Sequence, residues 1–408
     1  MQDGREVEKK ANAGYIILQI QFFYREFENI MSEDKSRTCA NDDGLIFPTG
    51  VYKGVPYFKP PVGFDEESAL ARRKAANLLA AEEAAELLPG IPELKMPITV
   101  SFIYAHPADY YGKPMLNADV GEWKNNFRRF KSMNIDTVIF QAALWRELKE
   151  CYYCSSNFPD LKCFKVVENM LQAAEEENMR VYMGGYGSVV GWGPGMTIED
   201  LKREAGEHRK CFDELSRIGK FDGMYFPAET CFRDKRLPER EFRMNYLYRS
   251  FSGMVKEKYP EMKVIVSPAT GHETENNGLF CEFWNAILEK SGVDVLMPQD
   301  SIGTGLSRIS QMSGQWKAWK SVADDRKLKL WSHTEIFERR GYRPEDNLYP
   351  AAAERVAVQL ALTEPYVERH CCWEALSFAT DERGEPGRAL RSFMSILKIK
   401  NNPPPSFA

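Results

Sequence analysis

Two glutamates lie at the ends of predicted β-strands that are far apart in the chain. Glu229 closes the segment 223–229, and Glu335 closes the segment 328–335. If the chain forms a barrel of alternating strands and helices, the carboxyl ends of its strands meet at one mouth. Two carboxyl groups facing each other across such a mouth are the catalytic groups that most glycoside hydrolases require to cleave a glycosidic bond. The chemistry therefore depends on whether the sequence predicts a barrel, and on which strands these glutamates follow.

The elements that must position these side chains begin near Pro97. From there, short β-rich runs alternate with amphipathic helical patterns, which is typical of βαβ units and a parallel sheet. Eight strands are predicted, at 98–104, 137–141, 180–184, 223–226, 263–267, 293–297, 329–332 and 367–373. Helices are predicted between them, at 120–133, 164–178, 198–218, 240–259, 279–290, 309–323 and 351–362, with another at 387–399. The pattern predicts an α/β fold, a (β/α)8 TIM barrel over residues 97–400.

The main alternative fold is a doubly wound open sheet. It has little support, because no Gly-x-Gly-x-x-Gly turn follows the first strand. Residues 1–96 differ from the rest and are predicted to form an N-terminal extension of mixed and helical character, to which we assign no role. Within it, a helix is predicted from Glu66 to Leu88, rich in Ala, Leu, Glu and Arg and ended by Pro89 and Gly90.

Counted along the predicted barrel, Glu229 ends strand 4 and Glu335 ends strand 7. This placement resembles the largest group of retaining glycosidase barrels, which carry the acid/base on strand 4 and the nucleophile on strand 7. Retention requires two carboxyl groups about 5 Å apart, one ionised and one kept protonated. The alternative is that either glutamate is a surface or salt-bridged residue just beyond its strand. With both on the expected strands, we take Glu229 as the candidate acid/base and Glu335 as the candidate nucleophile.

Further polar and aromatic side chains near the strand ends are candidates for binding a sugar. His333 lies two residues before Glu335, so in an extended strand both side chains point to the same side. Glycines in the loop after strand 3 favour a flexible rim there, without the spacing of a phosphate-binding loop. For the tryptophans within strands, the barrel core is the favoured interpretation over stacking on a sugar. The remaining candidates are Gln141, Trp145, Tyr186, Trp192, Gln299, Asp300, Trp373 and Glu374.

Composition narrows the choice of partner and compartment. The 408 residues carry a net charge of −5, with a pI near 5.8, which argues against nucleic acid or an anionic membrane as partner. No apolar run is long enough to predict a membrane span. The segment 14–24 loosely imitates a signal peptide, but glutamines interrupt it and no cleavage site follows. Nine cysteines without a regular framework favour free thiols, so a cytoplasmic location is expected.

Neither metal nor cofactor chemistry is predicted. The five histidines never form a His-x-His pair, and no Gly-x-Ser-x-Gly elbow is present. Cys151, Cys154 and Cys163 suggest zinc, but no second pair completes four ligands. We expect a carbohydrate partner, no cofactor and no metal, and the sequence leaves the oligomeric state open.

Several segments together resemble a bacterial family of uncharacterised, glycosidase-like TIM barrels, known as a domain of unknown function. They are Trp123, Phe127, Phe130, Lys131 and Met133 before 135–141, then Ala173 and Ala174 with 178–185, 226–229, 266–268 and 293–303. The last segment is the most distinctive, because a Gln-Asp pair at the end of strand 6 is unusual among barrels. The resemblance implies the barrel and a glycoside-hydrolase-like ancestry over about 98–397, and it does not extend to 1–96. The cysteines flanking Tyr152 and Tyr153 depart from the family pattern, which weakens the zinc interpretation further.

Three functions therefore compete. The first is a retaining glycoside hydrolase acting on a carbohydrate or glycoconjugate, with Glu229 and Glu335 as its catalytic pair. The second is a carbohydrate-binding barrel without hydrolysis, in which the two carboxyl groups lie too far apart or are held in ion pairs. The third is a different hydrolase that uses Asp300 or Glu374 in place of one glutamate, because barrels support many chemistries. The sequence specifies neither the sugar nor its linkage.

Overall fold

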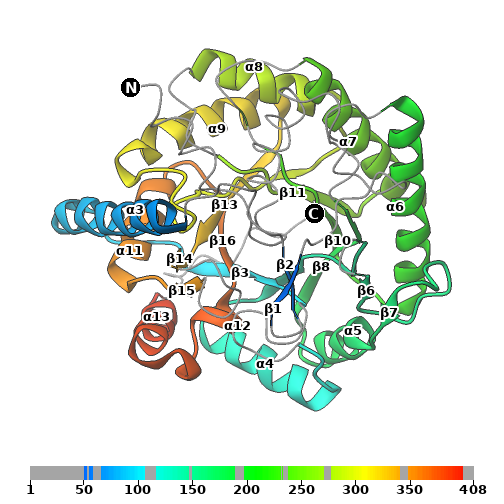
Figure 1. Ribbon diagram of the computed structural model, residues 1–408, viewed down its shortest axis with the longest axis horizontal. Helices are drawn as coiled ribbons and strands as arrows, with labels where there is room; N and C mark the ends of the chain where they lie inside the picture. The colour runs from blue at the N-terminus through cyan, green and yellow to red at the C-terminus, as the bar shows by residue number, and fades with distance from the viewer. Residues whose placement is uncertain are drawn as a thin grey trace.

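The computed structural model describes residues 50–52, 55–57, 66–105, 116–146, 149–188, 197–230, 232, 238–270, 277–340 and 348–397. Within them, eight parallel strands close into a barrel (Figure 1). In chain order these are β3 (Ile98–Ile103), β4 (Thr137–Phe140), β8 (Arg180–Gly184), β10 (Gly223–Phe226), β11 (Lys263–Val266), β12 (Val295–Leu296), β13 (Lys329–Glu335) and β16 (Arg369–Trp373). The last strand pairs with the first, so the predicted (β/α)8 barrel and its strand order are confirmed.

Helices surround the barrel in the ring that Figure 1 shows. They are α4 (Val120–Ser132), α5 (Val166–Glu176), α6 (Ile198–Ile218), α7 (Pro238–Lys258), α8 (Asn277–Leu288), α9 (Met312–Arg326), α11 (Ala353–Thr363) and α13 (Gly384–Ile396), with a short α12 (Ala375–Phe378). Local sequence explains where two of them begin. Asp119 with Glu122, and Thr197 with Asp200, form capping boxes that satisfy the first free N–H groups of α4 and α6.

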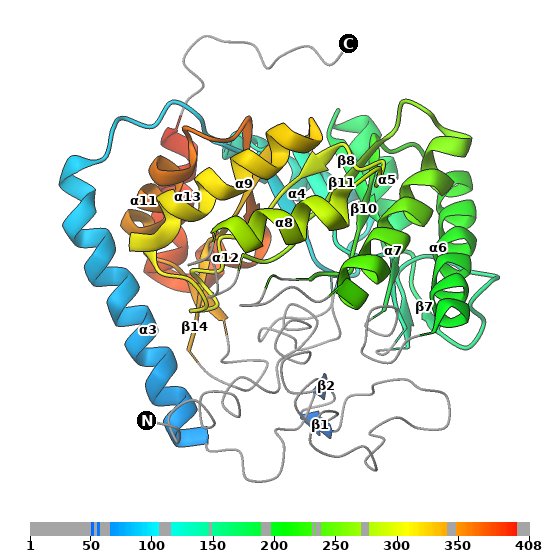
Figure 2. The same ribbon diagram turned by 90° about the horizontal axis from the view of Figure 1, so that it is seen from above.

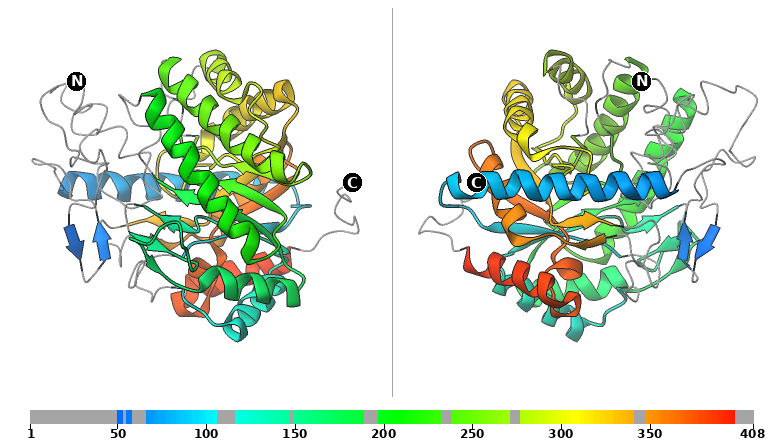
Figure 3. Two further views of the ribbon diagram at one scale, coloured as in Figure 1. Left: turned by 90° about the vertical axis from the view of Figure 1, so that its right-hand side faces the viewer. Right: turned by 60° about the vertical axis from the view of Figure 1, so that its left-hand side comes forward.

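Several elements lie outside the barrel wall. A long helix, α3 (Glu66–Leu87), runs along one side of the barrel, next to α11 and close to β14 (Figures 2 and 3). Short strands form β1–β2 (Gly50–Tyr52, Val55–Tyr57) and β14–β15 (Phe337–Arg339, Leu348–Pro350), and a four-stranded sheet of β5 (Leu144–Trp145), β6 (Glu150–Cys151), β7 (Lys162–Cys163) and β9 (Tyr186–Gly187). Single turns of 3-10 helix are η2 (Leu88–Gly90), η4 (Ile309–Gln311) and η5 (Asp381–Arg383).

Two predicted strands differ most in length from those expected. Strand 6 shrinks to Val295–Leu296, and strand 7 extends to Glu335, because β13 continues to pair with β16 beyond Ser332. The predicted helix at 66–88 is confirmed as α3. The division of the chain near residue 96 stays a prediction, and the segment 14–24 lies outside the described residues.

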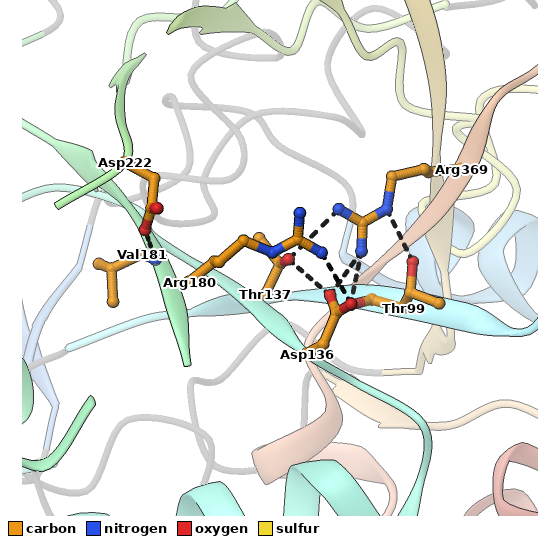
Figure 4. A network of polar contacts seen from close by, with 7 residues as sticks. All are labelled: Thr99, Asp136, Thr137, Arg180, Val181, Asp222 and Arg369. Carbon is orange, nitrogen blue, oxygen red and sulfur yellow. Dashed lines mark hydrogen bonds and ion pairs between the residues drawn. The ribbon is translucent and has the colours of Figure 1, made fainter. Parts of the chain in front are cut away.

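An ion-pair network lies at the amino-terminal end of the barrel strands (Figure 4). Asp136, just before β4, accepts hydrogen bonds from Arg369 of β16 at 2.5 Å and from Arg180 of β8 at 2.7 Å. Arg369 also donates to Thr99 and Thr137. The guanidinium charges and hydrogen bonds outweigh the effect of burial and hold the pKa of Asp136 below its ordinary value. This end of a barrel serves stability, and the network ties together four strands.

Aromatic side chains fill the barrel above this network. Trp331 meets Tyr182 edge to face, at 6.0 Å between ring centroids. Closer to the mouth, Phe102 contacts the rings of Tyr225, His333 and Trp373. Residues two apart along β13 thus face the interior, with Glu335 next in the series after Trp331 and His333. None of the helices in the described part of the chain has the length and hydropathy that a membrane crossing requires.

Candidate active site

Glu229 and Glu335 both lie at the carboxyl ends of the strands on which they were expected. Glu335 is the last residue of β13, and Glu229 follows β10 after a two-residue extension. Each side chain is only 2% exposed. The backbone after β10 still pairs with its neighbour, since Ala269 N donates to Thr230 O at 3.0 Å. Both carboxyl groups are therefore held by ordered barrel backbone.

Glu335 is fixed from the loop that follows β12. The backbone N–H of Thr304 donates to its Oε2 at 2.7 Å. A Cβ built on Gly303 would lie 2.9 Å from the Glu335 Cβ and 2.2 Å from the Phe337 carbonyl oxygen. The loop thus passes so close to Glu335 that only glycine fits at position 303.

Glu229 is linked to strands 5, 6 and 7 through a chain of polar contacts. Its carboxyl group accepts a hydrogen bond from the side chain of Gln299. Nε2 of Gln299 also donates to Ser267 O at 3.1 Å, and the Ser267 hydroxyl lies 2.8 Å from Nδ1 of His333. Gln299 and His333 were both predicted site residues, and the structure brings them together with Glu229.

Burial dominates the electrostatics of the two glutamates. It raises the pKa of Glu229 well above its ordinary value, the negative charge of Glu335 adds to the increase, and the Gln299 hydrogen bond opposes it. Burial and the neighbouring Asp300 raise the pKa of Glu335 to about 8, against the Thr304 N–H and the charges of Arg339 and Arg355. Burial therefore favours the protonated form of Glu229.

Gln141 and His333 are predicted site residues with buried polar atoms that no described protein group satisfies. Gln141, just beyond β4, is 1% exposed, and neither its Oε1 nor its Nε2 has a hydrogen-bond partner among the described residues. The Nε2 of His333 is likewise unsatisfied, while its ring stacks on Phe102 at 4.5 Å. Burial lowers the pKa of His333 to about 3, so the ring is neutral. Buried polar groups are costly without a partner, so both side chains are suited to contact a polar ligand.

Asp300 and Glu374, both predicted to bind a sugar, accept hydrogen bonds from protein groups. The Asp300 carboxylate accepts hydrogen bonds from Ile302 N at 3.1 Å and from Gln359 Nε2 at 2.6 Å, and its oxygens lie 3.3 and 3.4 Å from Glu335 N. Burial raises the pKa of Asp300 to about 6. Glu374 accepts from Tyr104 N at 2.9 Å and from the Ser377 hydroxyl. Both carboxyl groups hold the local backbone.

The predicted aromatic candidates are mostly packed into the protein. Trp145 is 1% exposed in β5 and packs against Gly187, where a Cβ would lie 2.6 Å from its ring. Tyr186 was expected on a flexible rim, but it is 5% exposed in β9, with its ring against Phe158 and His208. Trp373 is buried against Phe102 and Tyr104. Tyr186 differs from expectation because the loop after strand 3 begins as a strand; Trp192 lies outside the described residues.

The cysteines once considered for zinc are spread over the small sheet. Cys151 of β6 is buried and lies opposite Cys163 of β7, and Cys154 is exposed. Within the described ranges, no three or more His, Cys, Asp or Glu side chains are placed to hold a metal ion.

The residues that sequence reasoning missed act through the backbone or over long sequence distances. Gly303 and Thr304 contact Glu335 from the loop after β12, and Gln359 reaches Asp300 from α11. Arg355, also in α11, donates to the carbonyl oxygens of Phe337 and Glu335. The glycines at 303 and 305 were the available signal, since glycine often marks close approach of the backbone.

The fold is a (β/α)8 barrel with two buried carboxyl groups at the carboxyl ends of strands 4 and 7. The chain belongs to the family described as a domain of unknown function, DUF4434, which it matches over residues 109–386. No curated protein matches the sequence.

Solved structures resemble this barrel to different degrees. A crystal structure of a candidate α-L-fucosidase from Bacteroides thetaiotaomicron has 20% identity and a TM-score of 0.59, covering 74% of this chain and 96% of that one. A GH113 β-1,4-mannanase has 12% identity and a TM-score of 0.47, over 74% and 100% of the two chains. An endo-β-1,4-mannanase from Thermotoga petrophila has 10% identity and a TM-score of 0.46, over 77% and 79%. At 20% identity, the similarity to the fucosidase structure supports the fold alone. The TM-scores of the two mannanases are too low to support any conclusion.

Proposed function

We propose that the protein is a retaining glycoside hydrolase that acts on a carbohydrate or glycoconjugate, with Glu229 as acid/base and Glu335 as nucleophile. One observation carries the proposal. Two buried carboxyl groups end strands 4 and 7 of one barrel and lie close enough for the charge of Glu335 to raise the pKa of Glu229. Glycoside cleavage with retention needs carboxyl groups at these two positions, and the raised pKa of Glu229 favours the protonated form that the acid requires.

In the first step, a carboxylate oxygen of Glu335 forms a bond to the anomeric carbon while the glycosidic C–O bond breaks. The protonated Glu229 gives its proton to the departing oxygen. In the second step, Glu229 takes a proton from water, the water oxygen attacks the anomeric carbon, and Glu335 leaves as a carboxylate. The Gln299 side chain, which donates to Glu229, supports the ionised form that exists between the two steps.

Ionised Glu335 is supported by the groups around it. The Thr304 N–H donates to its Oε2, and the charges of Arg339 and Arg355 lower its pKa against the effects of burial and Asp300. These groups occupy fixed positions before substrate arrives. Fixed donors and charges stabilise developing charge without a cost of reorganisation at the moment of reaction.

The polar atoms of Gln141 and His333 are suited to grip sugar hydroxyl groups. A neutral amide offers both donors and an acceptor, and neutral His333 has one ring nitrogen free of protein partners among the described residues. A site that hydrogen-bonds a hydroxyl group discriminates strongly against analogues that lack it. The sugar recognised would thus be one with hydroxyl groups that reach strands 2 and 7.

The test compares wild type, Glu229→Gln and Glu335→Gln on a panel of aryl glycosides and polymeric glycans, with anomeric configuration followed by NMR. We expect retention of configuration and a loss of about 10²–10⁴-fold in turnover for Glu229→Gln, smallest for aryl leaving groups that need little protonation. Glu335→Gln should abolish covalent labelling by a fluoroglycoside inhibitor. Glu261→Gln, on an exposed site distant from the mouth, is the control. Unchanged turnover in both site variants would falsify the assignment.

The second candidate function is carbohydrate binding without hydrolysis. The observation in its favour is that Oε2 of Glu335 already accepts a backbone hydrogen bond from Thr304. Calorimetric titration distinguishes the two functions. A glycan that binds wild type and is recovered uncleaved after long incubation, with affinity reduced by Gln141→Ala, supports the binding barrel.

A further inference from the structure

Helix α3 precedes the barrel and lies outside the matched domain, which begins at residue 109. Most of its described side chains are exposed, and it meets the barrel through a narrow stripe. The stripe is spaced at one helical turn, as a single contacting face requires. Its members are Ala76, Asn77, Ala80, Glu83 and Ala84. Small side chains let the helix approach closely, so its two polar residues must find partners on the barrel.

Glu83 is the main polar contact of α3. It is 8% exposed, and its carboxylate accepts hydrogen bonds from Nε and a terminal nitrogen of Arg308, at 3.1 and 2.7 Å. It also accepts from the backbone N–H and the hydroxyl of Ser310, at 3.1 and 2.8 Å. These contacts outweigh the effect of burial and hold the pKa of Glu83 below its ordinary value. A buried carboxylate with four donors is a specific attachment, since any loss of its partners is costly.

Two further contacts join α3 to the same region. Nδ2 of Asn77 donates to the carbonyl oxygen of Arg339, the last residue of β14, at 2.8 Å. Gly305 has φ of +72°, and a Cβ built on it would lie 3.2 Å from the Cβ of Ala76. The three contacts therefore fall on the loop after β12, on η4 and on β14.

These segments are the ones that hold Glu335. Thr304 N donates to Glu335, and Gly303 packs against it. Arg339 N donates to Gly303 O at 3.0 Å, which ties β14 to the same loop. Two routes thus connect α3 with Glu335. The first runs from Glu83 through Arg308 and Ser310 into residues 300–307, the loop between β12 and η4. The second runs from Asn77 through β14 to Gly303.

We propose that α3 is a positioning element of the candidate active site. Through Glu83 and Asn77 it holds loop 300–307, η4 and β14 in the arrangement that places Thr304 against Glu335. The expected effect on turnover rests on the function proposed above. The expected effect on the order of the loop rests on the contacts alone. Glu83 and Asn77 touch no reacting atom. They act through the loop and are positioning residues.

The test compares Glu83→Ala and the milder Asn77→Ala with Glu82→Gln, a control on the exposed face of the same helix. Hydrogen exchange is measured by mass spectrometry in peptides covering 299–311 and 335–340, with β3 as the internal reference. We expect amide exchange in the two site segments to accelerate by roughly tenfold or more in both α3 variants, because local opening is governed by local contacts. Exchange in β3 should stay unchanged.

Turnover supplies the second measurement. We expect kcat of Glu83→Ala to fall by roughly 10- to 100-fold, because small misplacements of a reacting group are costly, while KM changes little. KM should stay nearly constant because Gln141 follows β4 and the His333 side chain is held by Ser267 and Phe102, none of which belongs to loop 300–307.

If peptides 299–311 and 335–340 exchanged in the α3 variants as slowly as in Glu82→Gln, the proposal would be overturned. It would also be overturned if exchange in β3 accelerated equally, because that would mean only global destabilisation. The exchange result stands whether or not the protein cleaves a glycoside. Turnover of Glu335→Gln tests the proposed function by itself, so the two can fail separately.

Discussion

Asp300 and Glu335 are two buried carboxyl groups tied to the same short loop. Gln359, Ile302 and the backbone of Glu335 surround Asp300, and its charge raises the pKa of Glu335. A nucleophile that is hard to ionise is a disadvantage at neutral pH. Asp300 is nevertheless positioned to orient the Glu335 backbone. It therefore helps to place Glu335, while its negative charge makes Glu335 harder to ionise.

Asp300→Asn separates these two effects. An asparagine oxygen can still accept from Ile302 N, and the amide of Gln359, whose Oε1 lacks a described partner, can turn to accept from the new amide. Without the negative neighbour the pKa of Glu335 falls, so the low-pH limb of kcat/KM, which reports its ionisation, moves to lower pH by roughly one unit. A pH–rate profile measures this, with exposed Asp160→Asn as control. A limb that moves upward would contradict the assigned role of Asp300.

The site residues differ in how far sequence could predict them. Glu229, Glu335, His333, Gln141 and Gln299 come at strand ends, where the barrel count alone predicts a place at the mouth. Their partners could not be predicted in the same way. Which polar groups already have partners depends on contacts between segments far apart in the chain, and these leave no local pattern.

Loop 300–307 is the element on which Glu335 depends most. Gly303→Ala puts a Cβ 2.2 Å from the Phe337 carbonyl oxygen, and backbone cannot give way as a flexible side chain can. We expect a loss of stability of about 1–3 kcal/mol, as for overpacked cores, and a loss of turnover. Thermal unfolding and kinetics measure the two.

Gly253→Ala is the matched control for this change. Gly253 lies within α7, and a Cβ there meets nothing within 4 Å. Alanine should therefore stabilise the helix by about 0.5–1 kcal/mol and leave turnover unchanged. If Gly303→Ala behaved like Gly253→Ala, the loop would be more adaptable than its contacts indicate.

At the scale of elements, prediction succeeded where periodicity extends over many residues. Helix α6 has the predicted bounds, and all eight barrel strands lie within or overlap the predicted runs. The four-stranded sheet of β5, β6, β7 and β9 was missed because two-residue strands carry no alternation to detect. The same holds for the hairpin β14–β15. These short strands lie beyond the barrel ends, where they hold the loops that surround the site.

The two ends of the barrel treat charge in opposite ways. At the amino-terminal end, Asp136 is matched by Arg369 and Arg180, and its pKa is lowered. At the carboxyl end, burial leaves Glu229 and Glu335 with raised pKa values. The first arrangement stabilises the fold. The second reduces the stability of the fold at neutral and higher pH and gives the site carboxyl groups with raised pKa values. That contrast has a measurable consequence for the whole molecule.

The consequence is a dependence of stability on pH. Glu229, Glu335 and Asp300 have folded-state pKa values above their ordinary values, so the folded state holds more protons than the unfolded one. Their contribution to stability is fully present below about pH 4. It is lost as pH rises through the folded-state pKa values, about 6 for Asp300 and about 8 for Glu335. The paired Asp136 and Glu83 have lowered values, and their contribution is lost instead as pH falls through those values.

Comparing wild type with the double variant Glu229→Gln and Glu335→Gln isolates the contribution of these two glutamates, because Asp300, Asp136 and Glu83 are common to both. Near pH 8 the double variant should melt at a higher temperature than wild type, by at least about 1 °C, the shift expected for roughly 1 kcal/mol in a chain of this size. Near pH 4.5 the difference should shrink, since the two glutamates are then largely protonated in the folded state and about half protonated in the unfolded state. Melting curves at intervals across this range measure the effect, with Glu261→Gln as control. A wild type more stable than the double variant at pH 8 would mean that partners stabilise the ionised glutamates more than burial penalises them.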